Sequence, residues 1–200
     1  WRGSQLDNRI RHIWPVLYLE GYLLVSWLGE VLLMAQILRP ISDINTGWSK
    51  YPSGAAGRYA CIDDETYSMS DPDAIYATAN VYQECKLSAP AETPASGGGT
   101  LKWYGYRDVT TGNLITPSVR CGSTVIKTGS AVGVSNNWYT LYSLSLSEAE
   151  MANITDWSNV RIRFAVSSYS SQQIWICMAY LEVPDAPFVP SLGLEMGCNF

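Results

Sequence analysis

Histidine, the side chain that most often acts as a general base, occurs only once in this sequence. Its only histidine, His12, lies outside residues 34–187, which make up most of the chain. Catalysis by a serine or cysteine nucleophile generally needs a base beside the nucleophile, and that base is most often histidine. We therefore predict that residues 34–187 contain no catalytic residues and that this region is not an enzyme.

Acidic residues gather in one stretch, where clustered oxygens could hold a cation. Calcium takes carboxylate and carbonyl oxygens from loops of this kind. The stretch also contains Asp71-Pro72-Asp73, a turn signal, so a solvated turn explains the same composition. We expect the turn, and we predict neither a metal site nor a cofactor. The residues concerned are Asp63, Asp64, Glu65, Asp71 and Asp73.

The cysteines are odd in number and no two are close enough to form a Cys-x-x-Cys pair, which excludes the common metal and redox motifs. Cys85 and Cys121 could form a disulfide. The alternative is that each cysteine is a free thiol buried as a small hydrophobic residue, and we expect this alternative. The five are Cys61, Cys85, Cys121, Cys177 and Cys198.

Aromatic rings with a polar atom are the remaining chemical resource, since the chain has 13 Tyr and 8 Trp but only 3 Phe. Such rings are favoured at protein interfaces and can stack on sugar rings. Tyr104 and Tyr106 alternate with Trp103, so both tyrosines point outward if Trp103 points into the core. The candidate binding residues are Tyr104, Tyr106, Trp48 and Trp138. The alternative is an ordinary core with tyrosine hydroxyls at its rim.

The elements that would position these rings are short strands separated by Gly, Ser, Asn, Asp and Pro clusters. We predict strands at residues 58–62, 80–87, 100–108, 114–120, 124–127, 138–146, 159–167 and 172–183. The alternation over residues 160–166 indicates a strand with Arg161 and Arg163 on its wet side. Residues 174–181 are apolar throughout, which predicts a central strand or one covered on both faces, paired with the strand before it.

Ser147-Glu148-Ala149-Glu150 matches a capping box and predicts one helical turn that bridges two sheets. Together these patterns predict an all-β fold, a two-sheet antiparallel β-sandwich of jelly-roll type at residues 34–187, with a C-terminal tail at residues 188–200. The net charge of −5, without a basic cluster in the sequence, argues against nucleic acid as a partner.

Residues 13–38 are strongly apolar, but Glu20 and Glu30 interrupt them, so a membrane span is not expected. The segment also lacks the pattern of a secretory signal. An amphipathic helix is one interpretation of this leader. The other is that Met34 is the natural start and that residues 1–33 are an upstream region read in frame, because Gly29-Glu30-Val31 can be encoded by a ribosome-binding sequence.

Several short motifs together resemble a β-sandwich domain of phage virion and tail-associated proteins. They are Leu38-Arg39-Pro40, Ser42-Asp43, Gly47-Trp48, residues 62–65, residues 146–150, residues 154–157 and residues 160–164. The resemblance covers Met34 to about Pro187 and implies attachment to a particle, with no functional residue to carry over. It implies a location at a virion or particle surface after assembly in the bacterial cytoplasm.

The resulting expectation is a non-enzymatic structural or surface-attachment module that binds copies of itself or other virion proteins. The alternative is a carbohydrate-binding module with a glycan as its partner. That alternative requires Tyr104, Tyr106 and a tryptophan, either Trp48 or Trp138, to converge in one groove.

Overall fold

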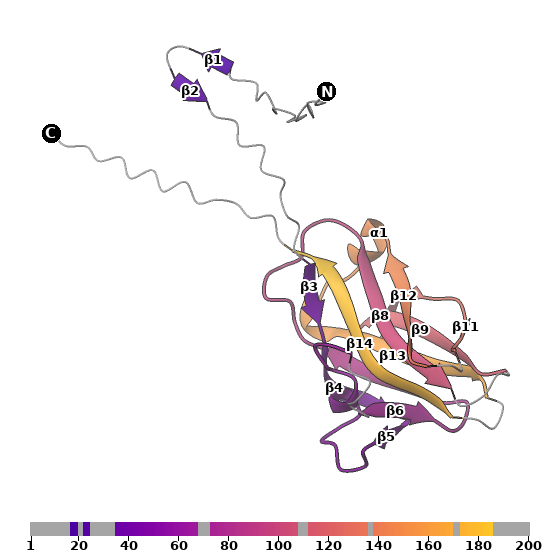
Figure 1. Cartoon of the computed structure of the whole chain (residues 1–200). Helices are drawn as coiled ribbons and strands as arrows, with labels where there is room; N and C mark the ends of the chain where they lie inside the picture. Colours follow the sequence, from indigo (N-terminus) through magenta and orange to yellow (C-terminus); the bar gives the residue numbers. More distant parts are fainter. Residues whose placement is uncertain are drawn as a thin grey trace, which may run out of the picture. The chain divides into compact units, whose positions relative to one another are not determined.

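The chain divides into two compact units, Trp1–Leu32 and Leu33–Phe200. The computed structural model describes residues 35–67, 73–107, 112–135, 138–169 and 173–185, and the backbone of two short strands in the first unit (Figure 1). These strands, β1 (Leu17–Leu19) and β2 (Tyr22–Leu24), pair antiparallel. The interpretation of this stretch as a helix is therefore wrong at those residues. His12, Cys198 and the tail at 188–200 lie outside the described residues.

The second unit is a two-sheet antiparallel β-sandwich of jelly-roll type, as the sequence predicts. The first sheet has the order β10-β9-β13-β7-β4, with β11 beside β9. Its strands are β4 (Pro40–Thr46), β7 (Tyr82–Leu87), β9 (Leu114–Cys121), β10 (Thr124–Thr128), β11 (Val132–Gly133) and β13 (Val160–Ser168).

The second sheet has the order β12-β8-β14-β6-β5, with β3 beside β14. Its strands are β3 (Ala35–Leu38), β5 (Ser49–Tyr51), β6 (Ala74–Ala77), β8 (Gly99–Arg107), β12 (Thr140–Leu146) and β14 (Ile174–Pro184). Figure 1 shows β14 and β8 of this sheet in front of β13 and β9 of the first sheet.

Alternating side chains from the two sheets meet in one core. On β13 the even-numbered residues of 160–166 are buried, and on β8 the odd-numbered residues of 99–105 are buried. The ring of Trp103 lies 5.7 Å from that of Tyr142 on its own sheet and 5.7 Å from that of Phe164 on the first sheet, so large side chains of the two sheets meet in the core. Truncating a ring such as Phe164 would cost roughly 3–5 kcal/mol.

The pairing of β14 differs from the sequence prediction. It pairs with β8, β6 and β3, whereas the preceding strand β13 belongs to the other sheet. The prediction that it is a central strand is confirmed, because neighbours flank it on both sides.

Residues 58–62, predicted as a strand, instead contain the 3-10 helix η1 (Tyr59–Cys61). The cause is a carboxylate from a distant strand. Asp43 Oδ2 accepts from the backbone N–H of Arg58 at 2.8 Å, and Asp43 Oδ1 accepts from the N–H of Tyr59 at 3.0 Å. These two bonds satisfy amides at the helix start that would be left without intrahelical partners.

The link between β12 and β13 crosses from one sheet to the other, as predicted. It contains α1 (Glu148–Met151) and the 3-10 helix η2 (Trp157–Asn159). The capping box is complete: the hydroxyl of Ser147 accepts from the Glu150 amide, and the Glu150 carboxylate accepts from the Ser147 amide at 2.8 Å.

Cys85 and Cys121 are both free thiols, as are Cys61 and Cys177. Over the residues that the structure describes, no group of three or more His, Cys, Asp or Glu side chains is placed to hold a metal ion. Asp71 of the acidic stretch lies outside them. The same part of the chain contains no helix long and apolar enough to cross a membrane.

Candidate binding site on the outer face of the second sheet

The outer face of the second sheet carries the tyrosines that the alternation on β8 predicts. Trp103 is 1% exposed and lies in the core, so Tyr104 and Tyr106 project from the opposite face. Their register partners on β14 are Met178 and Trp175. The predicted direction of both tyrosines is therefore confirmed.

A β-bulge in β14 lets the strand present its large side chains to this same face. The register with β8 shifts between Ile176 and Met178, which leaves Cys177 as the extra residue. Before the bulge the odd-numbered Trp175 faces outward, and after it the even-numbered Met178 and Tyr180 do so. This change of parity explains why no simple alternation is visible in the sequence of the strand.

Two tyrosines from loops lie over the sheet tyrosines. The ring of Tyr67 stacks on that of Tyr104, with centroids 4.5 Å apart. The ring of Tyr139 lies 6.1 Å from Tyr67 and 5.5 Å from Tyr106. Burial in this cluster raises the pKa of the Tyr67 hydroxyl. Tyr104 and Tyr106 are consequently half-buried parts of a layered cluster and not an open patch.

Trp175 extends the aromatic surface towards the other edge of the sheet. Its ring centroid lies 4.5 Å from that of Tyr76 on β6 and 6.2 Å from that of Tyr51 on β5. Tyr51 is 48% exposed, so the surface ends in an accessible ring at this edge. We call the outward rings of the second sheet and its loops the aromatic face; its members are Tyr51, Tyr67, Tyr76, Tyr104, Tyr106, Tyr139, Trp175 and Tyr180.

The structure separates the two tryptophans that the sequence offers as binding residues. Trp138 is 67% exposed and directly precedes Tyr139 of the aromatic face. Trp48 is 1% exposed, packs in the core and donates from Nε1 to the carbonyl of Val81 at 3.4 Å. The inclusion of Trp48 among the surface residues is therefore wrong in this structure, because a buried indole cannot contact a ligand.

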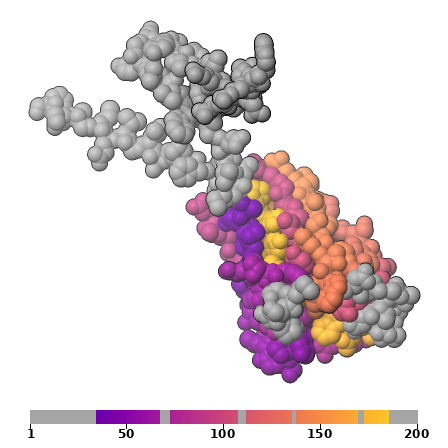
Figure 2. Space-filling model, in the orientation of Figure 1, coloured from indigo at the N-terminus to yellow at the C-terminus, as the bar shows by residue number. Residues whose placement is uncertain are grey.

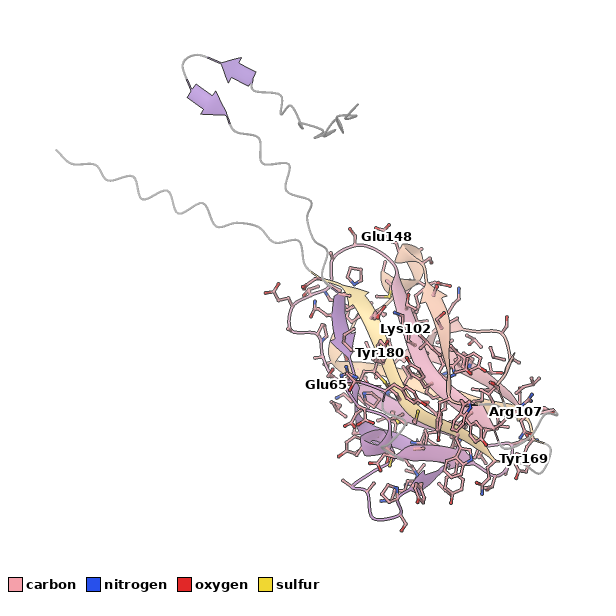
Figure 3. The ribbon with its side chains drawn as sticks, in the orientation of Figure 1. Glu65, Lys102, Arg107, Glu148, Tyr169 and Tyr180 are labelled. Atoms are coloured by element: carbon pink, nitrogen blue, oxygen red, sulfur yellow. The ribbon has the colours of Figure 1, made fainter. Side chains whose placement is uncertain are left out.

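A strip of polar groups continues the aromatic face along β8 and β14. Lys102 Nζ lies 2.7 Å from Glu182 Oε1, and this hydrogen bond raises the pKa of Lys102. Lys102 is the register partner of Tyr180, and its Nζ lies 6.0 Å from the centre of that ring. Figure 3 shows Lys102 and Tyr180 near each other on adjacent strands, and Figure 2 shows β14 in yellow beside β3 in indigo.

Arg39 connects this strip to the loop that carries Tyr67. Its guanidinium lies 5.7 Å from the centre of the Tyr180 ring and donates to the backbone carbonyls of Asp64 and Glu65. The short segment from Asp64 to Tyr67 is thereby held against the sheet. A cation close to a ring face also contributes a favourable interaction of its own.

Sequence reasoning missed the polar residues of this site. Lys102 could have been found, because it shares the outward parity of Tyr104 on the predicted strand. Glu182 and Arg39 could not have been found. The outward direction of Glu182 depends on the bulge in β14, and the place of Arg39 depends on the change of sheet between β3 and β4. We call Arg39, Lys102, Glu182 and the exposed Ser143 the polar strip. Ser143 is the register partner of Lys102 on β12.

No family model matches the chain, and no curated protein matches it. Several solved structures are similar to the chain. The C-terminal CBM6 of the laminarinase LamC from Zobellia galactanivorans is 12% identical, with 76% of this chain and 100% of that chain covered and a TM-score of 0.43. CBM29_1, a carbohydrate-binding module from Piromyces equi, is 14% identical, with 78% and 94% covered and a TM-score of 0.38. These similarities are too distant to assign a ligand to this chain.

Proposed function

We propose that this chain is a non-enzymatic carbohydrate-binding module whose glycan lies across the outer face of the second sheet. The observation that carries the proposal is the continuity of the aromatic face with the polar strip on one set of strands. Tyr104 and Lys102 are two residues apart on β8, and their partners Met178 and Tyr180 are two residues apart on β14.

This combination matches the chemistry of a sugar. The C–H surfaces of a sugar ring pack on aromatic rings, while its hydroxyls need donors and acceptors beside those rings. Tyr180 and Trp138 supply rings, and Lys102, Glu182 and Ser143 supply hydrogen-bonding groups. Charges that are already paired, as Lys102 and Glu182 are, suit a neutral ligand because neither charge is left alone when water is displaced.

Affinity electrophoresis of the full chain in gels containing neutral polysaccharides, with an array of neutral oligosaccharides, tests the proposal. We expect binding to at least one of them, weakened ~10-fold or more by Tyr180→Ala or Trp138→Ala, since stacked aromatic side chains often dominate such contacts. Tyr82→Ala is the matched control, because Tyr82 is a 36% exposed tyrosine on the first sheet. Absence of any glycan binding, or equal loss in the control, would contradict the proposal.

A second candidate, assembly with further copies of the chain on a phage virion or similar particle, is favoured by a different surface. The pairing of the edge strand β4 with β7 shifts register once at Ile41 and once at Ile44. These isoleucines are 47% and 44% exposed. Exposed apolar side chains on a sheet edge are suited to pairing with another chain.

Sedimentation velocity over a range of concentrations tests this second candidate. Assembly predicts association that Ile41→Ser with Ile44→Ser abolishes and that Val125→Ser, at another exposed apolar residue of the first sheet, leaves unchanged. A wild-type chain that remains monomeric throughout, without other virion proteins present, would count against self-assembly.

A further inference from the structure

The outer face of the first sheet, opposite the aromatic face, collects basic residues that are far apart in the sequence. Lys86 on β7 is the register partner of Arg161 on β13, and Arg161 is the register partner of Arg120 on β9. The three form a row across adjacent strands, about 10 Å from end to end at the usual strand spacing. Arg163 lies two residues along β13, on the same face. We call these four residues the basic row.

One carboxylate lies among them. Glu84, whose side chain is 3% exposed, has Oε2 at 2.6 Å from Arg163 Nε and Oε1 at 3.3 Å from Arg161 Nη1. Arg120 Nε is 3.9 Å from the same carboxylate. Asn159 Oδ1 accepts from Arg161 Nε at 3.1 Å and Nη2 at 2.9 Å, which fixes the plane of that guanidinium.

The outward positions of the three central strands therefore have four cationic side chains and one carboxylate, a local charge of +3, on a chain whose net charge is −5. Like charges that face each other across neighbouring strands are unfavourable unless an opposite charge lies between them. Glu84 supplies one such charge, which leaves three positive charges. A second single anion would still leave two of them unneutralised. These residues form no basic cluster in the sequence, because they come from positions 86, 120, 161 and 163.

Hydrogen-bonding capacity also remains on this face. Arg120 donates from Nη2 to the backbone carbonyl of Ser123, and its Nε, 3.9 Å from the Glu84 carboxylate, has no hydrogen-bond partner in the described residues. Guanidinium groups present several N–H donors in a planar fork that matches the oxygens of carboxylate, sulfate and phosphate groups. An oxyanion placed over the row would supply the missing negative charge.

We propose that the basic row binds an acidic polysaccharide through its sulfate or carboxylate groups. This inference goes beyond the proposed function, because it concerns the other sheet and a charged ligand. The guanidinium of Arg163 lies 4.1 Å from the centre of the Tyr82 ring beside the row, and this cation–π contact helps to fix its position. The ring and the ion-pair network hold the guanidiniums in place before a ligand arrives, which lowers the entropic cost of binding.

Nucleic acid fits this surface less well than a polysaccharide with spaced charges. Duplex DNA carries one negative charge for every ~1.7 Å of its axis. A row of about 10 Å would therefore contact few of its phosphates, and its dense negative charge would continue beyond the row. The chain as a whole is acidic, with a sequence pI of about 4.8, whereas nucleic-acid-binding domains are commonly strongly basic. Electrostatic repulsion outside the row would then oppose the contact.

Affinity electrophoresis of the full chain against dextran sulfate, polygalacturonate and neutral dextran tests the inference. We expect retardation by dextran sulfate, by polygalacturonate or by both, decreasing as salt is added, and none by dextran. The first two polymers distinguish sulfate from carboxylate as the recognised group. Arg161→Gln should weaken binding ~10-fold, the effect of one lost charge-assisted hydrogen bond.

Two further variants separate a local contact from an effect of folding or of net charge. Lys86→Gln leaves the contacts of Glu84 in place and should still weaken binding several-fold. Lys50→Gln, on β5 of the second sheet, changes the charge equally and should leave binding unchanged. Absence of retardation by both acidic polymers, equal loss in Lys50→Gln, or tighter binding of duplex DNA than of either polymer would each overturn the inference. A retained response to the polymers in Tyr180→Ala would confirm that the two faces act separately.

Discussion

The ring of Tyr67 stacks on the ring of Tyr104 with their planes 5° from parallel. Tyr104 belongs to β8, whereas Tyr67 belongs to a loop that Arg39 holds through two backbone carbonyls. One face of the Tyr104 ring is therefore covered by another residue of the same chain. Tyr67 controls how much of Tyr104 a ligand can contact.

Replacing Tyr67 by alanine should uncover Tyr104 at a small cost in stability. An aromatic pair contributes about 1 kcal/mol beyond its buried area, so we expect the free energy of unfolding in urea to fall by at least that amount. Tyr51→Ala is the control, because the Tyr51 ring is 48% exposed and its edge contact with Trp175 has a longer separation of 6.2 Å. Equal losses in the two variants would show that the stacked geometry adds nothing.

Alkaline pH should destabilise the fold through its buried thiols. Burial raises the pKa of Cys85 and of Cys177 from 9.0 to about 12, and that of Cys61 to about 11. Below pH 9.0 the thiols are protonated in both states; above it the unfolded chain loses protons that the native chain keeps. Stability is thus fully present below this pH and falls as pH rises towards the native pKa values.

The contribution of one thiol can be isolated by measuring urea unfolding at several pH values from about 8 to about 11. Cys85→Ala should flatten the decline by up to about 1.4 kcal/mol per pH unit, the limit for one proton. The cavity that it creates lowers stability equally at every pH, so the slope is the diagnostic quantity. An unchanged slope would refute the assignment. Cys121→Ala, at a half-exposed thiol, serves as the control.

Where a strand alternates regularly, its faces could be predicted from the sequence. On β8 the burial of Trp103 and the outward direction of Tyr104 follow from a period of two, and β13 behaves in the same way. The capping box at Ser147 was equally readable, because its two hydrogen bonds join residues only three positions apart. Local patterns therefore established both the fold class and part of the aromatic face.

Features that depend on distant residues could not be read in this way. The bulge at Cys177 changes which residues of β14 face outward, and the carboxylate of Asp43 converts a predicted strand into η1. The burial of Trp48 and the basic row likewise depend on which strands become neighbours. Strand propensity and charge counts contain no information about those pairings.

Asp43 offers a direct test of such a long-range contact. Besides the amides of Arg58 and Tyr59, its carboxylate accepts from Gln83 Nε2 at 3.1 Å. Asp43→Ala leaves these donors without their acceptor, so we expect a loss of about 2–3 kcal/mol in urea unfolding. Asp43→Asn, which keeps one acceptor oxygen, should lose less. Similar stability of both variants and the wild type would mean that water replaces the carboxylate without cost.

The carboxylate of Glu84 should be the most sensitive charged group on the first sheet. Its side chain is 3% exposed and has ion-pair contacts with Arg120, Arg161 and Arg163, the shortest being 2.5 Å to Arg163 Nη2. Glu84→Gln keeps the shape but removes the only negative charge that the described residues place among these cations. Losing one partner of a buried ion pair typically costs roughly 3 kcal/mol, and we expect a loss of that size.

Salt distinguishes this electrostatic cause from a packing defect. Raising NaCl from about 0.1 M to about 1 M shortens the Debye length from ~10 Å to ~3 Å, which weakens repulsion among the remaining cations. The Glu84→Gln variant should therefore regain part of its stability relative to the wild type in urea unfolding at the higher salt. The control is Glu182→Gln, which breaks the pair with Lys102 at a site 27% exposed and should cost under about 1 kcal/mol. A Glu84→Gln defect that is insensitive to salt, or no larger than that of the control, would show that Glu84 does not neutralise the basic row.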